Sequence, residues 1–153
     1  MRAILGTAAL FAMIAIASPG SAQAQTAGKG TPVAQAFEHY EMVRAALAAD
    51  NLKDAAAPAK ALAAAAEAAG GADAKKAADL LASAKNIEDA RKNFGDLSVV
   101  LVPLFQAEKI PGTTAYMCSM KDRPWVQRGD KISNPYYGKS MLTCGTALPP
   151  KTK

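Results

Sequence analysis

The stretch IEDARKNFGDLSVVLVPLF, residues 87–105, decides the predicted fold. Its apolar residues recur at spacings of three and four, which places them on one face of an α-helix. Asn86 precedes the stretch as a candidate N-cap, and acidic residues occupy the first turn, where the helix dipole favours them. Residues 99–102 favour a strand locally, but the longer helical period outweighs them, and Pro103 predicts a kink or an end near it. The inward face is predicted to contain Ile87, Ala90, Phe94, Leu97, Leu101, Leu104 and Phe105.

Three further helices are predicted upstream of this stretch. The first starts at Thr31-Pro32, a hydroxyl N-cap followed by proline at the first helical position. The second is capped by Asn51, contains Pro58 and is expected to stop at Gly70-Gly71. Asp73 can cap a third, shorter helix. The inward residues of this third helix are predicted to be Ala77, Leu80, Leu81 and Ala84.

The four helices predict an all-α fold, an antiparallel four-helix bundle over residues 32–110, because their connections are short and each has an apolar face. Residues 111–146 differ in composition, since glycine, proline, asparagine, aspartate and serine recur there and mark successive turns. We expect this segment to be an irregular Cys/Met-rich module that packs on the first and fourth helices. Residues 25–31 are predicted to be a flexible linker, and residues 147–153 a disordered tail.

Residues 1–24 are predicted to be a secretory signal peptide. Arg2 supplies the positive start, residues 3–17 are apolar and uncharged, and Ala22-Gln23-Ala24 fits a cleavage site. The apolar run is shorter than the roughly 20 residues of a membrane-spanning helix, so cleavage is favoured over a membrane anchor. We therefore expect a periplasmic protein that has no membrane contact after cleavage.

Charge and motifs exclude several functional classes. The net charge is +5, and its lysines are scattered rather than clustered, so nucleic acid is not expected as a partner. The sequence has no Ser-His-acid set, no glycine-rich phosphate loop and no pair of carboxylates marked for acid–base work. We therefore expect that the protein is not an enzyme.

Sulfur is concentrated near the C-terminus, where both cysteines and three of the six methionines fall within residues 115–146. Cys118 and Met120 lie two residues apart, a spacing that gives one face in an extended segment. Met141 and Cys144 lie three residues apart, which gives one side of a turn. Thiolates and thioethers are soft donors that suit Cu(I), so the two pairs are candidate ligands of one Cu(I) ion.

The same cysteines also fit a disulfide. Export would place them in an oxidising compartment, and an even count of two fits one bridge between Cys118 and Cys144. Closing that loop would contribute on the order of 3 kcal/mol. Spacing alone favours the disulfide over copper.

Three residues are auxiliary candidates for the metal site: Met117, Trp125 and His39. Trp125 can stack over a bound cation or anchor the core of the module. His39, the only histidine, lies beside Phe37 and Tyr40 in the first predicted helix, where an edge-of-core role is favoured over a ligand role.

The set Tyr116-Met117-Cys118-Ser119-Met120, Trp125 and the run from Asn134 to Gly145 resembles an uncharacterised bacterial family of exported domains. That family occurs alone or fused to the periplasmic adaptor subunits of CusB-type heavy-metal efflux pumps. Its signature is similar to Y-x-C-P-M, a tryptophan and N-P-Y-x-G-x-x-M-x-x-C-G, with proline usual where this chain has Ser119. The resemblance covers roughly Phe37 to Gly145.

The resemblance implies that the metal residues are Cys118, Met120, Met141 and Cys144, with Cu(I) as the ion and Ag(I) left open as a second one. It implies a periplasmic copper-binding protein that buffers copper or passes it to an efflux system, with the pump adaptor as partner. The alternative is a disulfide-stapled helical module that binds another envelope protein and has no metal role.

The mature protein is predicted to begin at Gln25, because cleavage is expected after Ala24. Intact-mass measurement on the exported protein checks this. A mass that still includes residues 1–24 would contradict the assignment.

Overall fold

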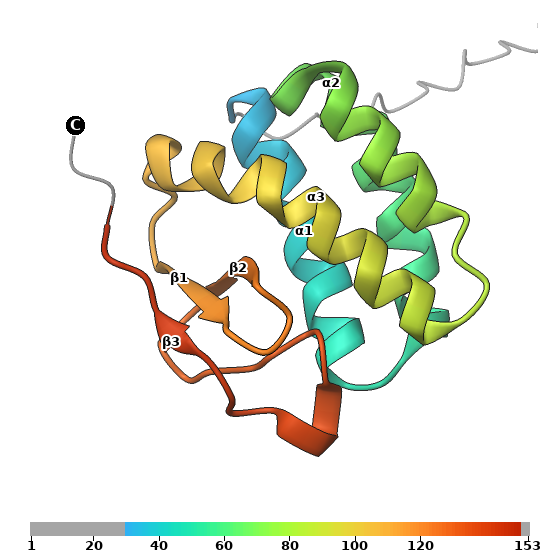
Figure 1. Ribbon diagram of the computed structural model, residues 1–153. Coiled ribbons are helices and arrows are strands. Elements are labelled where there is room, and N and C mark those ends of the chain that lie inside the picture. Colours follow the sequence, from blue (N-terminus) through green and yellow to red (C-terminus); the bar gives the residue numbers. More distant parts are fainter. Residues whose placement is uncertain (1–29, 151–153) are drawn as a thin grey trace, which may run out of the picture.

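The computed structural model describes residues 30–150, which form three helices followed by a three-stranded antiparallel sheet (Figure 1). Helix α1 is Pro32–Ala48, α2 is Leu52–Ala82 and α3 is Ile87–Glu108. Within residues 30–150 no helix combines the length and the hydropathy that crossing a bilayer requires. The expected signal peptide and residues 25–29 of the expected linker lie outside the described residues.

The C-terminal part of the chain is a small sheet with a long covering loop. Strand β1 (Thr113–Cys118) and strand β2 (Arg123–Arg128) form an antiparallel hairpin. The covering loop, residues 129–145, follows β2. It contains the short 3₁₀ helix η1 (Gly138–Met141) and leads to strand β3 (Thr146–Ala147). The strand order is β2-β1-β3, so β3 pairs with the edge of β1 that β2 leaves free. The amide of Leu148 donates to the carbonyl of Ala115 at 2.8 Å, so part of the expected tail belongs to the ordered sheet.

The expected all-α four-helix bundle is wrong in two respects. The second and third predicted helices form one element, α2, in which Gly71 alone departs from helical angles, at φ 75° and ψ −166°. Glycine adopts this conformation without steric cost, so the helix bends at Gly71 without an intervening loop. The module expected to be irregular contains a β-hairpin instead. Its strands were missed because turn residues surround them and Pro124 lies within the second one.

Three of the four predicted helix starts are confirmed by their caps, whereas Asp73 lies inside α2. The Thr31 hydroxyl accepts a hydrogen bond from the amide of Ala34 at 3.1 Å. The Asn51 and Asn86 side chains each accept one from the amide three residues later, at 3.1 and 2.8 Å. Pro58 and Pro103 both lie inside their helices, which continue past them.

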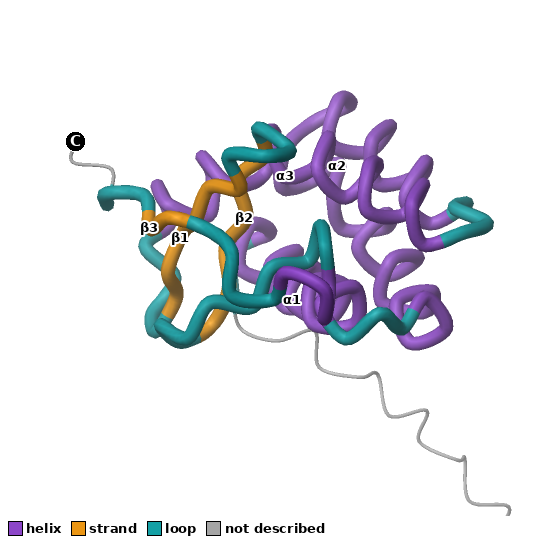
Figure 2. Tube along the Cα trace, turned by 60° about the horizontal axis from the view of Figure 1, so that its bottom comes forward, coloured by secondary structure: helices purple, strands orange, loops and turns teal. Residues whose placement is uncertain are grey.

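The helices and the sheet form successive layers. Helix α2 packs on α1 and α3 on the side away from the sheet, while β2 contacts α3 and α1 on the other side (Figure 2). The fourth predicted helix is α3, so the expected position of the module on the first and fourth predicted helices is confirmed. The buried face of α2 is mostly alanine, whose small side chain lets the backbones of α1 and α3 approach closely.

Four aromatic rings fill the core between α1 and α3. The ring centroid of Tyr40 lies 4.7 Å from that of Phe94 and 5.0 Å from that of Phe105, and Phe37 packs on Phe105 at 5.2 Å. The Tyr40 and Ser98 hydroxyls are hydrogen-bonded at 2.8 Å, and Ser98 donates to the carbonyl of Phe94 at 2.7 Å. Burial raises the pKa of Tyr40 far above its ordinary value, so the phenol stays neutral.

The predicted apolar face of residues 87–105 is confirmed by burial of Ala90, Phe94, Leu97, Leu101 and Phe105. The predicted inward face of residues 73–84 is wrong at Leu80, which is 53% exposed. Ala74 and Ala78 are buried there instead. Apolar residues occur on more than one side of this segment, so their spacing alone does not determine which face is buried.

Phe94→Ala should lower the free energy of unfolding by about 3 kcal/mol, because it removes a fully buried ring and leaves a cavity beside Tyr40. Thermal and denaturant unfolding measure the change. Val99→Ala is the matched control, because Val99 lies on the same helix and is 49% exposed. Equal losses in the two variants would contradict this assignment of the core face.

Candidate functional site

The two cysteines lie at the same end of the sheet. Cys118 is the last residue of β1, is fully buried, and pairs with Arg123 of β2. On the other edge of β1, Met117 pairs with Thr146 of β3. Continuing this antiparallel register by one residue sets Gly145 opposite Cys118. Cys144 therefore lies just before β3, near the end of β1. Both cysteines have free thiols, and Cys144 is half-buried.

Asn134 holds the segment that carries Cys144. Its side chain is fully buried, and its amide nitrogen donates to the carbonyl of Cys144 at 2.7 Å. Its side-chain oxygen accepts from the backbone amide of Tyr136 at 2.7 Å. The backbone amide of Asn134 donates to the carbonyl of Leu142, also at 2.7 Å. One asparagine therefore connects three parts of the covering loop and fixes the backbone at Cys144.

The Trp125 ring packs against the segment that contains Cys144 and Gly145. It is fully buried, stacks on Tyr116 with ring centroids 5.2 Å apart, and donates its indole N–H to Gln127 at 3.0 Å. A Cβ on Gly145 would lie only 2.4 Å from the Trp125 ring. The chain can cross the indole at this short distance only because residue 145 has no side chain.

The three methionines near this end of the sheet differ in how far their side chains are exposed. Met120 follows Cys118 in the β1–β2 turn and is 59% exposed. Met141 ends η1 and is half-buried, and its carbonyl accepts from the amide of Cys144 at 3.1 Å. Met117 is also half-buried, but strand alternation places it on the opposite face of β1 from Cys118.

The structure does not bring His39 to the cysteines. His39 is half-buried on α1, and its neighbour Glu38 forms an ion pair with Arg128. Arg128 pairs with Thr113 at the end of the hairpin away from Cys118. Among residues 30–150, no group of three or more His, Cys, Asp or Glu side chains is arranged to hold a metal ion. A metal site at the cysteines would therefore use methionine sulfur as well.

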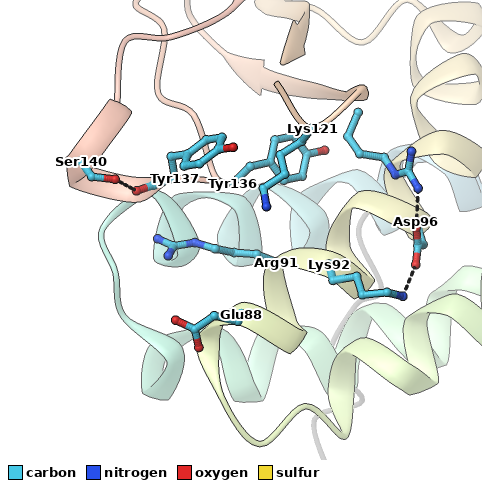
Figure 3. A pocket seen from close by; sticks show the side chains of 9 residues that line it. Glu88, Arg91, Lys92, Asp96, Lys121, Tyr136, Tyr137 and Ser140 are labelled. Carbon is cyan, nitrogen blue, oxygen red and sulfur yellow. Dashed lines mark hydrogen bonds and ion pairs between the residues drawn. The ribbon is translucent and has the colours of Figure 1, made fainter. Parts of the chain in front are cut away.

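A second feature was missed by sequence reasoning, a cleft of about 420 Å³ between α3 and the C-terminal module (Figure 3). Its charged side chains come from α3 and from the β1–β2 hairpin, and aromatic rings of the covering loop form another wall. The available signal was the polar side of residues 87–105, where charged residues recur at helical spacing. The residues on which its charge and shape depend are Arg91, Lys92, Asp96, Lys121, Arg123 and Tyr137.

Ion pairs fix the acidic groups in and beside this cleft. Asp96 accepts from Lys92 and from Arg123, each at 3.0 Å. Partial burial acts to raise the pKa of Asp96, but these two cations outweigh it and hold that pKa below its ordinary value. Hydrogen bonding from the Arg91 guanidinium likewise lowers the pKa of Asp50. Both carboxylates are therefore ionised at neutral pH.

Comparison with known proteins gives one match. The model of a family described as a protein of unknown function, DUF3347, matches residues 36–112. The match includes most of α1 and all of α2 and α3, and it ends just before β1. No curated protein and no solved structure matches the chain.

Asn134→Ala should expose the Cys144 segment, because it removes the hydrogen bonds that fix that backbone and leaves buried polar groups unpaired. We expect a loss of about 1–3 kcal/mol in stability and faster labelling of Cys144 by a thiol reagent. Asn93→Ala is the control, since the Asn93 side chain makes one exposed hydrogen bond, to Leu80. Unchanged labelling in Asn134→Ala would show that the segment is held by other contacts.

Proposed function

The chain belongs to this DUF3347 family of proteins of unknown function, and we propose that it binds Cu(I) after export, through Cys118 and Cys144 assisted by Met120 and Met141. The observation that carries this proposal is the position of two free thiols at one end of the same sheet. Two thiolates neutralise the charge of Cu(I), and thioethers complete a soft ligand set without deprotonation.

The surroundings of the four sulfur atoms support unequal roles. Cys118 is fully buried, so its thiolate needs a cation beside it to offset the loss of water. Met120 is 59% exposed in the turn directly after Cys118, where an incoming copper donor or an acceptor can reach its sulfur. Met141 is tied to the Cys144 backbone by a hydrogen bond. In this proposal Met120 exchanges the ion with partners, while the cysteines hold it.

The biological role proposed is copper tolerance in the periplasm. The resemblance of residues 116–120 and 134–145 to exported domains found with CusB-type adaptors motivates this role. The protein would buffer copper, or pass it to the adaptor subunit of a heavy-metal efflux pump. Ag(I) has the same preference for soft donors and is proposed as a second ion for the site.

The disulfide-stapled interaction module is the second candidate, and the position of the two cysteines at one sheet end favours it too. Oxidation of both thiols by an external disulfide would remove two protons and two electrons and join β1 to the segment that precedes β3. The thiolates would then no longer be available to copper. Redox state would thus decide whether the sheet end holds metal or a bridge.

Anaerobic titration of the reduced mature protein with Cu(I), in competition with a chromophoric chelator, tests the proposal. We expect one Cu(I) per chain. Met120→Ala and Met141→Ala should each weaken binding about tenfold, because each removes a neutral donor. Cys118→Ser and Cys144→Ser should each weaken it more than roughly a hundredfold, because each removes a charged donor.

Met42→Ala is the matched control, because Met42 is a methionine of similar exposure, 57%, on α1. It should leave the affinity unchanged. Equal affinity in the wild type and the Cys118→Ser/Cys144→Ser double variant would exclude this site. A thiol count on the exported protein that shows a stable bridge would then favour the interaction module.

A further inference from the structure

The cleft between α3 and the C-terminal module carries an excess of positive charge (Figure 3). Four basic and two acidic side chains line it. Asp96 is shared between Lys92 and Arg123, so one carboxylate faces two cations. Arg91 forms its ion pair with Asp50, which lies outside the lining. A surplus of positive charge therefore remains on the hairpin side of the cleft.

Lys121 is the cation of the cleft lining for which the described residues supply no carboxylate partner. It is exposed in the β1–β2 turn, and among the described residues it makes no ion pair. Its ammonium lies over the ring of Tyr137, 5.2 Å from the ring centroid. In Figure 3 its side chain extends into the cleft on the side of the Tyr137 ring. An ammonium beside an aromatic wall fits an anionic group attached to an apolar body.

The walls of the cleft are already fixed. The Arg91 guanidinium donates to the carbonyl of Pro135 at 3.0 Å and to that of Leu47 at 2.9 Å. Asp50 also accepts from the backbone amide of Lys139 at 3.1 Å. A Cβ on Gly138 would lie 1.9 Å from the carboxylate of Asp50, so the covering loop sits directly on this ion pair. A ligand would enter a preformed space, which reduces the conformational entropy lost on binding.

We propose that this cleft binds a small monocarboxylate with an aromatic body, whose carboxylate pairs with Lys121 and Arg123 and whose ring packs against Tyr137. The volume of about 420 Å³ lies within the range of small-molecule sites. Glu88 and Asp96 in the lining oppose a second negative charge, which favours a monoanion over a dianion such as phosphate. The proposal does not depend on copper binding.

Titration of the ¹⁵N-labelled, reduced, metal-free mature protein with phenylacetate tests this site by NMR. Saturable shifts are expected at the amides of residues 121–123 and 137–140, with a dissociation constant on the order of 1 mM for so small a probe. Phenylacetamide has the ring without the charge, acetate has the charge without the ring, and inorganic phosphate has a higher charge. Each of these should bind at least roughly fivefold more weakly.

Lys121→Ala and Tyr137→Leu should each weaken phenylacetate binding at least about fivefold. Lys76→Ala, at an exposed lysine on α2, should leave it unchanged. The NMR spectrum of each variant shows whether the fold is retained. No saturation by phenylacetate, equal binding of phenylacetamide or phosphate, or an unchanged affinity in folded Lys121→Ala would overturn the proposal. Because copper is absent from every arm, failure here leaves the metal proposal standing, and the converse also holds.

Discussion

Tyr136 joins the helical layer to the sheet, and the rest of the structure depends on that junction. Its ring lies 6.0 Å from Phe94 of α3 and 6.0 Å from Trp125 of β2, measured between ring centroids. Through these two neighbours one row of aromatic contacts runs from Phe37 on α1 to Tyr116 on β1. Its hydroxyl donates to the carbonyl of Pro124, and burial keeps its pKa well above the ordinary value. A small sheet that could not fold alone thus becomes an extension of the helical core.

The helices were predictable where local chemistry determines them. The caps at Thr31, Asn51 and Asn86 and the apolar period of residues 87–105 depend on neighbouring residues, so the sequence alone locates them. The helix end predicted at Gly70-Gly71 is instead a bend within α2, because two glycines can end a helix or only kink it. The sheet was missed because the pairing of β1 with β2 and β3 is non-local, and because turn residues interrupt its short apolar runs.

The candidate sites, too, were predictable only in part from the sequence. Sequence spacing identified the sulfur residues but not their arrangement, which depends on the β1–β3 register and on Asn134, a residue with no metal chemistry of its own. Of the cleft, the sequence showed only the polar side of residues 87–105 and not the side chains that lie opposite it. The cations of the cleft come from α3 and from the β1–β2 hairpin some thirty residues later, and they converge because β2 packs on α3. A single sequence has no local pattern for such convergence.

The strand order β2-β1-β3 has a consequence for how the chain is made. The central strand β1 precedes β3 by the whole covering loop, so the two residues that pair with its free edge are made after it. Until then β1 presents unpaired amides and carbonyls, which are a template for pairing with another chain. Premature termination before Thr146 would leave that edge permanently open. Aggregation would then be a risk of truncated chains that contain the three helices and the β1–β2 hairpin but lack β3.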